Sequence, residues 1–145
     1  MVDTIAPASG AAAVRPPHGP FYEVGFEAQL DPGRHYPGIS AQRHFQEANR
    51  QLYEFFKANP VYADFMESLY PGIKKGVAPG TKGAFSRKPP TPDVTWHHHA
   101  TREGTLQLVP RSHHRAAGVV QDSLHPDGRG GMENWGGGRK VKGSQ

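Results

Sequence analysis

The chain has 145 residues, a formal net charge of +4 at neutral pH and no cysteine. This length predicts one domain, and the missing thiols exclude disulfides and thiolate-ligated metals. No apolar run approaches the roughly 20 residues that a membrane-spanning helix needs, so we expect no membrane insertion. The basic charge is compatible with a polyanionic partner.

The first 20 residues are rich in Ala, Pro and Gly and contain almost no large apolar side chain. This composition is typical of a flexible linker or a domain boundary. We therefore expect residues 21–145 to form the single folded domain.

Two helices are expected to form a support at about residues 40–70. Ser40 is a suitable N-cap for a helix over residues 41–58, whose apolar face is formed by Phe45, Ala48, Leu52, Phe55 and Phe56. Asn59-Pro60 then places proline at the first position of a second helix. That helix, residues 61–70, is expected to run antiparallel to the first and to bury Val61, Phe65 and Leu69.

The segment from Lys74 to Pro92 is basic and rich in Gly and Pro, with cations at Lys74, Lys75, Lys82, Arg87 and Lys88. Such a segment is usually a solvated loop, which is the interpretation we favour. The alternative is a loop that follows a phosphate backbone, where Lys and Arg gain from counterion release.

The histidines are concentrated in the C-terminal third, where six of the nine lie between His97 and His125. Val94–His97 has the residue types of a strand, Arg102-Glu103-Gly104 those of a turn, and Thr105–Val109 alternates as a return strand. Pro110 can open a helix that runs through Arg111 to about Ala117. The pattern predicts a ββα unit within a catalytic core at about residues 93–140.

Clustered imidazoles on such a unit indicate a site for one divalent metal ion, with Zn, Ni, Mg and Mn not distinguished by the sequence. Neighbouring residues of a regular strand point to opposite faces. One of His97 and His98 is therefore expected to be a ligand, and the other to act as a base that takes a proton from water. A bound metal would polarise a phosphate and stabilise the leaving 3′ oxygen.

Several of these segments together resemble the WHH branch of the HNH/endonuclease VII superfamily, over roughly residues 36–140. The segments are Trp96-His97-His98, Leu106-Gln107-Leu108-Val109-Pro110, His114, residues 124–131 and residues 135–140. The resemblance implies that His97 is a metal ligand and His98 the general base. It also implies His114 as second ligand and His125 as third, with the adjacent His113 as the alternative helix ligand.

Other polar residues are expected to assist. Gln107 is the nearest candidate for the residue that braces the loop carrying the base. Glu133 could orient a ligand imidazole, and His99 is expected at the strand end or as a donor beside the site. The cations that flank the site and could clamp phosphate are Arg102, Arg111 and Arg115. Trp96 is expected to pack under the site, and His18, His35 and His44 to be ordinary polar surface.

The expected fold class is α+β, with a ββα-metal (HNH, His-Me finger) core on a helical support. The resemblance implies a metal-dependent endonuclease, most simply a non-specific DNase toxin of the Rhs or type VI secretion kind. Such a domain would be secreted or injected as the C-terminal part of a larger toxin, act in the target-cell cytoplasm and require a cognate immunity protein. The alternatives are an RNase on the same scaffold and a non-catalytic, metal-stabilised module that binds nucleic acid.

Overall fold

The computed structural model describes residues 23–114 and 131–136. Within them, three strands form one antiparallel sheet: β1 (Phe26–Gln29), β2 (Val94–His98) and β3 (Thr105–Pro110). The strand order is β1-β3-β2, so β3 is central and β2 is an edge strand. The expected hairpin is β2–β3, with Trp96 opposite Leu108. β1 was not anticipated, and it completes the sheet on the other side of β3.

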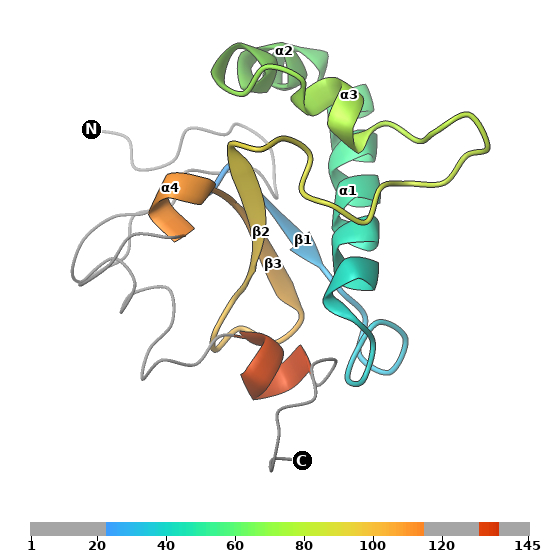
Figure 1. Ribbon diagram of the computed structural model, residues 1–145, viewed down its shortest axis with the longest axis vertical. Helices are drawn as coiled ribbons and strands as arrows, with labels where there is room; N and C mark the ends of the chain where they lie inside the picture. The colour runs from blue at the N-terminus through green and yellow to red at the C-terminus, as the bar shows by residue number, and fades with distance from the viewer. Residues whose placement is uncertain (1–22, 115–130, 137–145) are drawn as a thin grey trace.

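The helices are α1 (Ala41–Ala58), α2 (Pro60–Leu69), α3 (Ile73–Val77) and α4 (Arg111–His114), followed by a π-helical turn, η2 (Met132–Gly136). Figure 1 shows α1 along one face of the sheet and α4 on the side away from α1. A sheet of antiparallel strands with separate helices confirms the α+β class. No helix of the described residues is long and apolar enough to cross a membrane.

The first helix forms where the sequence predicts it. The Ser40 side chain accepts a hydrogen bond from the backbone N–H of Arg43 at 3.2 Å, which satisfies one of the unpaired N–H groups of the first turn. Asn59 ends the helix, because its side-chain amide donates to the carbonyl of Phe55 at 3.0 Å. α1 buries His44, Ala48, Asn49, Leu52 and Phe56. Phe45 and Phe55, expected on the buried face, are only partly buried.

The second helix packs through a different face from the one expected. Val61, Phe65 and Leu69 are exposed, with Val61 84% exposed, and the buried residues are Tyr62, Ala63 and Met66. Tyr62 and Met66 both lie against Gly25, where the Tyr62 hydroxyl donates to the glycine carbonyl. β1 and the residues before it therefore decide which stripe is buried. Figure 1 also shows α2 lying across the end of α1, so the expected antiparallel pair is not formed.

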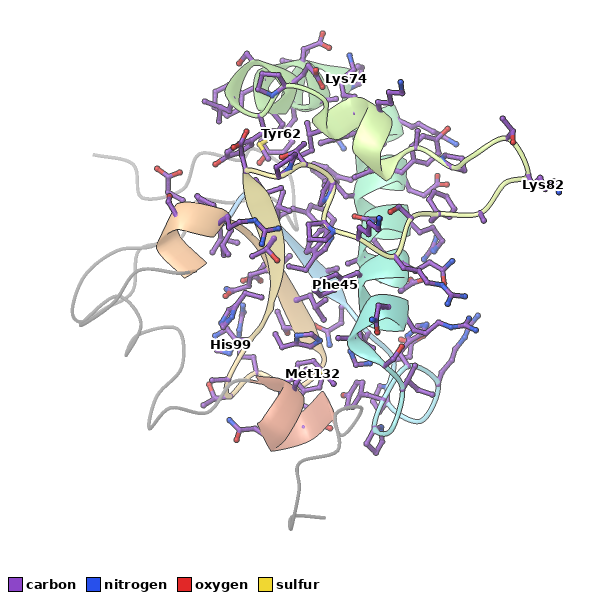
Figure 2. All side chains as sticks on the ribbon, in the orientation of Figure 1. Phe45, Tyr62, Lys74, Lys82, His99 and Met132 are labelled. Atoms are coloured by element: carbon purple, nitrogen blue, oxygen red, sulfur yellow. The ribbon has the colours of Figure 1, made fainter. Side chains whose placement is uncertain are left out.

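The basic segment is not wholly a loop. Its first residues form α3, in which Ile73 and Val77 are fully buried and hold the segment on the core. Beyond α3 the chain extends away from the sheet, and Figure 2 shows Lys82 at the tip of this extension. The loop interpretation is therefore wrong for residues 74–77, which belong to α3, and holds for the residues around Lys82.

The hairpin turn depends on Gly104, whose φ of +79° lies in the left-handed region that favours glycine. A Cβ atom there would stand 2.6 Å from Nε2 of Gln29, so space as well as dihedral angle requires glycine. The expected turn is confirmed. Pro110 belongs to β3, and the following helix begins at Arg111 rather than at the proline.

Candidate active site

His97 and His98 lie in regular strand and point to opposite faces of the sheet, as the sequence predicts. Trp96 and His98 face α1, since each contacts a side chain of that helix. The Trp96 indole Nε1 donates to Oδ1 of Asn49 at 2.9 Å. Nε2 of His98 lies 3.0 Å from Nδ1 of His44. His97, between them, faces away from α1. The two imidazoles therefore cannot both ligate one ion from the same face.

His98 is enclosed by aromatic rings. The centroid of its ring lies 5.2 Å from that of His44, 5.5 Å from Trp135 and 6.0 Å from Phe45. Only 8% of the residue is exposed. Packing on three sides fixes the orientation of this imidazole.

The turn η2 is fastened to the end of β2. The Trp135 indole N–H donates to the carbonyl of His99 at 2.6 Å, and the Asn134 amide donates to the carbonyl of Ala100 at 2.7 Å. At Gly131, a Cβ atom would stand 2.7 Å from Cβ of His98 and 2.4 Å from the His99 carbonyl oxygen. Glycine is therefore required for this close approach, which places Trp135 against His98.

On the opposite face, His97 belongs to a polar row across the three strands. The strand register pairs Glu27 with Gln107, and Gln107 with His97. The Gln107 amide donates to the Glu27 carboxylate at 2.8 Å, and Arg102 forms an ion pair with the same carboxylate. Gln107 and Arg102, both singled out from the sequence, thus meet at Glu27, which the sequence did not indicate.

His99 follows β2 and stabilises the hairpin turn. Its Nδ1 accepts hydrogen bonds from the backbone N–H groups of Thr101 at 3.2 Å and Arg102 at 2.8 Å. Burial lowers the pKa of His99, and the charge of Arg102 lowers it further. Both effects favour the neutral ring, which is the form that can accept these bonds.

Arg111 fastens the start of α4 to the start of β2. Its Nε donates to the carbonyl of Pro92 at 2.8 Å, and Nη2 donates to the carbonyl of Val94 at 3.2 Å. The Arg111 guanidinium thus stabilises the fold through Nε and Nη2. A hydrogen bond from Arg111 to a phosphate would use its other N–H groups.

The expectation that His44 lies on the surface is wrong. It is fully buried on α1, its Nε2 donates to the carbonyl oxygen of His35 at 2.7 Å, and its Nδ1 faces His98. The signal was present in the sequence, because His44 precedes Ala48 and Leu52 by one and two helical turns and so shares their stripe. His35, half-buried, accepts a hydrogen bond from the backbone N–H of Asp31 through its own ring.

The other predicted site residues lie outside the described part of the structure. These are the residues His18, Arg115 and His125, and the side chains of His113, His114 and Glu133. Within the described residues, no three His, Asp or Glu side chains gather into a metal-binding group. Of the three predicted ligands, His97 alone has a described side chain. An imidazole nitrogen is a ligand atom that suits the divalent metals expected here.

A groove of about 480 Å³ opens beside Phe45, whose ring lies against that of His98. Phe45, which contacts the His98 ring, and Met132 of η2 both line it (Figure 2 labels both). Arg87 and Lys88 also line it, and we call this side of the groove its rim. Two amides of α1 hold this rim. The Gln46 amide donates to the carbonyl of Phe85 at 3.1 Å, and the Asn49 amide donates to those of Ser86 and Lys88 at 3.0 and 2.8 Å.

A second cavity, of about 670 Å³, adjoins Ser40 and is lined by Arg34, Arg43 and Arg50 among others. The smaller groove is the better candidate for a substrate site, because its wall includes a ring in contact with His98.

Comparison with known proteins assigns this part of the chain to a family. The comparisons with curated proteins and with solved structures returned no match. Residues 85–138 match a family model described as "WHH: A nuclease of the HNH/ENDO VII superfamily with conserved WHH". The matched range begins two residues before Arg87, contains Trp96-His97-His98 and ends after η2. Residues 85–138 therefore form a WHH domain, a nuclease domain of the HNH/ENDO VII superfamily.

Proposed function

We propose that the protein is a metal-dependent endonuclease that hydrolyses phosphodiester bonds, with DNA as its substrate. The observation that carries this proposal is the coincidence of the WHH match with two buried histidines held on opposite faces of one edge strand. Such an arrangement separates a metal ligand from a base, which is the division of labour that hydrolysis requires.

In the proposed reaction His98 is the general base. It takes a proton from a water molecule as the water oxygen attacks phosphorus, and the bond from phosphorus to the 3′ oxygen breaks. The products are a 5′-phosphate and a 3′-hydroxyl, and His98 returns its proton to solvent or to the leaving oxygen. The rings around His98 hold it in one orientation, which lowers the entropic cost of reaching the reacting geometry.

We propose His97, His114 and His125 as the ligands of one divalent ion, with His113 as the alternative to His114. When bound, the ion would polarise the phosphate and stabilise the leaving oxygen. Support comes from α4, which contacts β2 and β3 and lies on the side of the sheet away from α1 (Figure 1). His97 also faces away from α1, because its strand neighbours Trp96 and His98 face that helix. Gln107, opposite His97 in the register and hydrogen-bonded to Glu27, is the residue that we propose orients the His97 ring.

The groove lined by Phe45 and Met132 is the proposed path of the nucleic-acid backbone on the His98 side of the sheet, with Arg87 and Lys88 as contacts to phosphates other than the one that is cut. Within the described residues, no ion pair joins either side chain to a carboxylate, and both are exposed. The backbone around them is nevertheless held, because the Gln46 amide donates to the carbonyl of Phe85 and the Asn49 amide donates to those of Ser86 and Lys88. Two unpaired cations on an anchored rim favour a phosphate contact over a purely solvated loop.

Removal of both cations is expected to weaken substrate binding while leaving the rate of the bound complex unchanged. The double variant Arg87→Ala, Lys88→Ala should raise KM, and the slope of log affinity against log salt should become shallower by about 2. Binding of duplex DNA at several salt concentrations measures this slope. Lys75→Ala, which removes an exposed cation from α3, is the matched control; an equal effect there would contradict the assignment.

The substrate class is tested with DNA and RNA of the same sequence, each incubated with the full chain and with Mg, Mn, Ni or Zn. We expect cleavage of DNA that chelator abolishes. Cleavage of RNA alone would identify an RNase on the same scaffold. Binding without cleavage of either, together with a large loss of thermal stability on chelation, would identify a metal-stabilised binding module.

We further propose that the domain acts as an antibacterial toxin, carried at the C-terminus of a larger secreted or injected protein and neutralised by an immunity protein. This rests on the resemblance of its motif to the nuclease domains of polymorphic toxins. Expression inside a bacterium should arrest growth and degrade the chromosome, and the His98→Ala variant should be tolerated. Growth that is equally impaired by both forms would argue against nuclease toxicity.

A further inference from the structure

A second histidine, outside the WHH domain, contacts the proposed base. His44 is on α1, whereas the matched range begins at residue 85. Its ring forms a two-link chain: Nε2 lies 2.7 Å from the carbonyl oxygen of His35, and Nδ1 lies 3.0 Å from Nε2 of His98.

The chemistry of the first link determines the proton positions along this chain. A carbonyl oxygen only accepts hydrogen bonds, so Nε2 of His44 must carry a proton. Burial lowers the pKa of His44, against the opposing effect of the His35 carbonyl, and so favours the neutral ring. A neutral ring protonated on Nε2 has its lone pair on Nδ1. The proton between the two rings must therefore belong to Nε2 of His98.

It follows that a neutral His98 holds its lone pair on Nδ1. We propose that His44 is a positioning residue, which holds the His98 ring in one orientation and one tautomer through its contact with Nε2. This inference rests on the proposed role of His98 as general base. The helical support thereby takes part in catalysis, because one of its side chains sets the proton arrangement of the base.

A merely structural role for His44 makes a different prediction. If the ring only fills space between α1 and the sheet, an apolar ring of similar size should preserve both rate and tautomer. His44→Phe retains the ring but has no acceptor. His44→Asn places an oxygen acceptor near the position of Nδ1 and is the conservative variant.

The test combines long-range ¹H–¹⁵N spectra of the imidazoles in the metal-free full chain with cleavage kinetics. In the wild type, we expect His98 to show a protonated Nε2 and an unprotonated Nδ1. His44→Phe should lose this single tautomer and lower kcat by roughly 10- to 100-fold with little change in KM. His44→Asn should retain most of the wild-type kcat and the single tautomer of His98.

Three results would overturn the inference: a wild-type His98 protonated on Nδ1, a kcat that survives His44→Phe, or a tautomer that His44→Phe leaves unchanged. The spectra need no catalytic turnover, so they separate this inference from the proposed function. A wild type that cleaves nothing would contradict the nuclease proposal, whereas a wild type that cleaves equally well with His44→Phe would contradict only the role of His44.

Discussion

Replacement of His98 by alanine is expected to lower kcat by about 10²- to 10⁴-fold, the usual contribution of a general base. The variant removes the one imidazole of β2 that faces α1, but leaves His97 on the opposite face. Metal binding and KM should therefore change little. Single-turnover cleavage, measured with metal content and circular dichroism on the same samples, distinguishes a lost base from a lost fold.

Added imidazole provides the control for this prediction. The cavity left by His98→Ala lies beside a groove open to solvent, so free imidazole should restore part of the rate if the missing group is a base. A variant that cleaves as fast as the wild type would show that the base is another group. A variant that loses its metal along with its activity would instead place His98 among the ligands.

Replacement of Trp96 by alanine is expected to destabilise the fold by about 3–5 kcal/mol, the range for truncating a large buried aromatic residue. Trp96 is 2% exposed and packs edge-on against Phe26, with 6.3 Å between ring centroids. It also donates to Asn49, whose amide holds the rim of the groove. Trp96→Ala should therefore loosen both the packing of the core and the backbone of the residues that line the proposed substrate site.

Trp96→Phe separates the contribution of apolar packing from that of the indole hydrogen bond to Asn49. It retains most of the apolar volume but removes the indole N–H, which leaves the Asn49 oxygen without this donor at a cost of about 1–3 kcal/mol. Denaturant unfolding of both variants gives the free energies. Equal stability of wild type and Trp96→Ala would show that Trp96 does not support the site in the way described.

The features that followed from the sequence are those set by local chemistry. α1 is bounded by a serine that caps its first turn and an asparagine that ends its last. The β2–β3 hairpin is bounded by a glycine that takes a positive φ. The opposite orientation of His97 and His98 follows from strand geometry alone. These outcomes need no knowledge of the rest of the chain.

The features that were missed depend on distant partners. In α2, two neighbouring stripes are both apolar, and the choice between them is made by Gly25 and β1, a strand of only four residues. His44 shares the helical stripe of Ala48 and Leu52, but its side chain is polar, and this polarity favours the surface over the core. Its burial depends on finding two partners, the His35 carbonyl and the His98 ring, which a single position in a sequence does not reveal.

The most direct test of the central claim is incubation of the purified full chain with covalently closed supercoiled plasmid and a divalent metal. A closed circle has no ends, so any conversion to nicked and then linear DNA requires internal cleavage. We predict this conversion with added Mg, Mn or Ni, its abolition by chelator and its recovery when metal is restored. Plasmid that stays supercoiled with every metal, or cleavage that survives chelation, would contradict a metal-dependent DNA endonuclease.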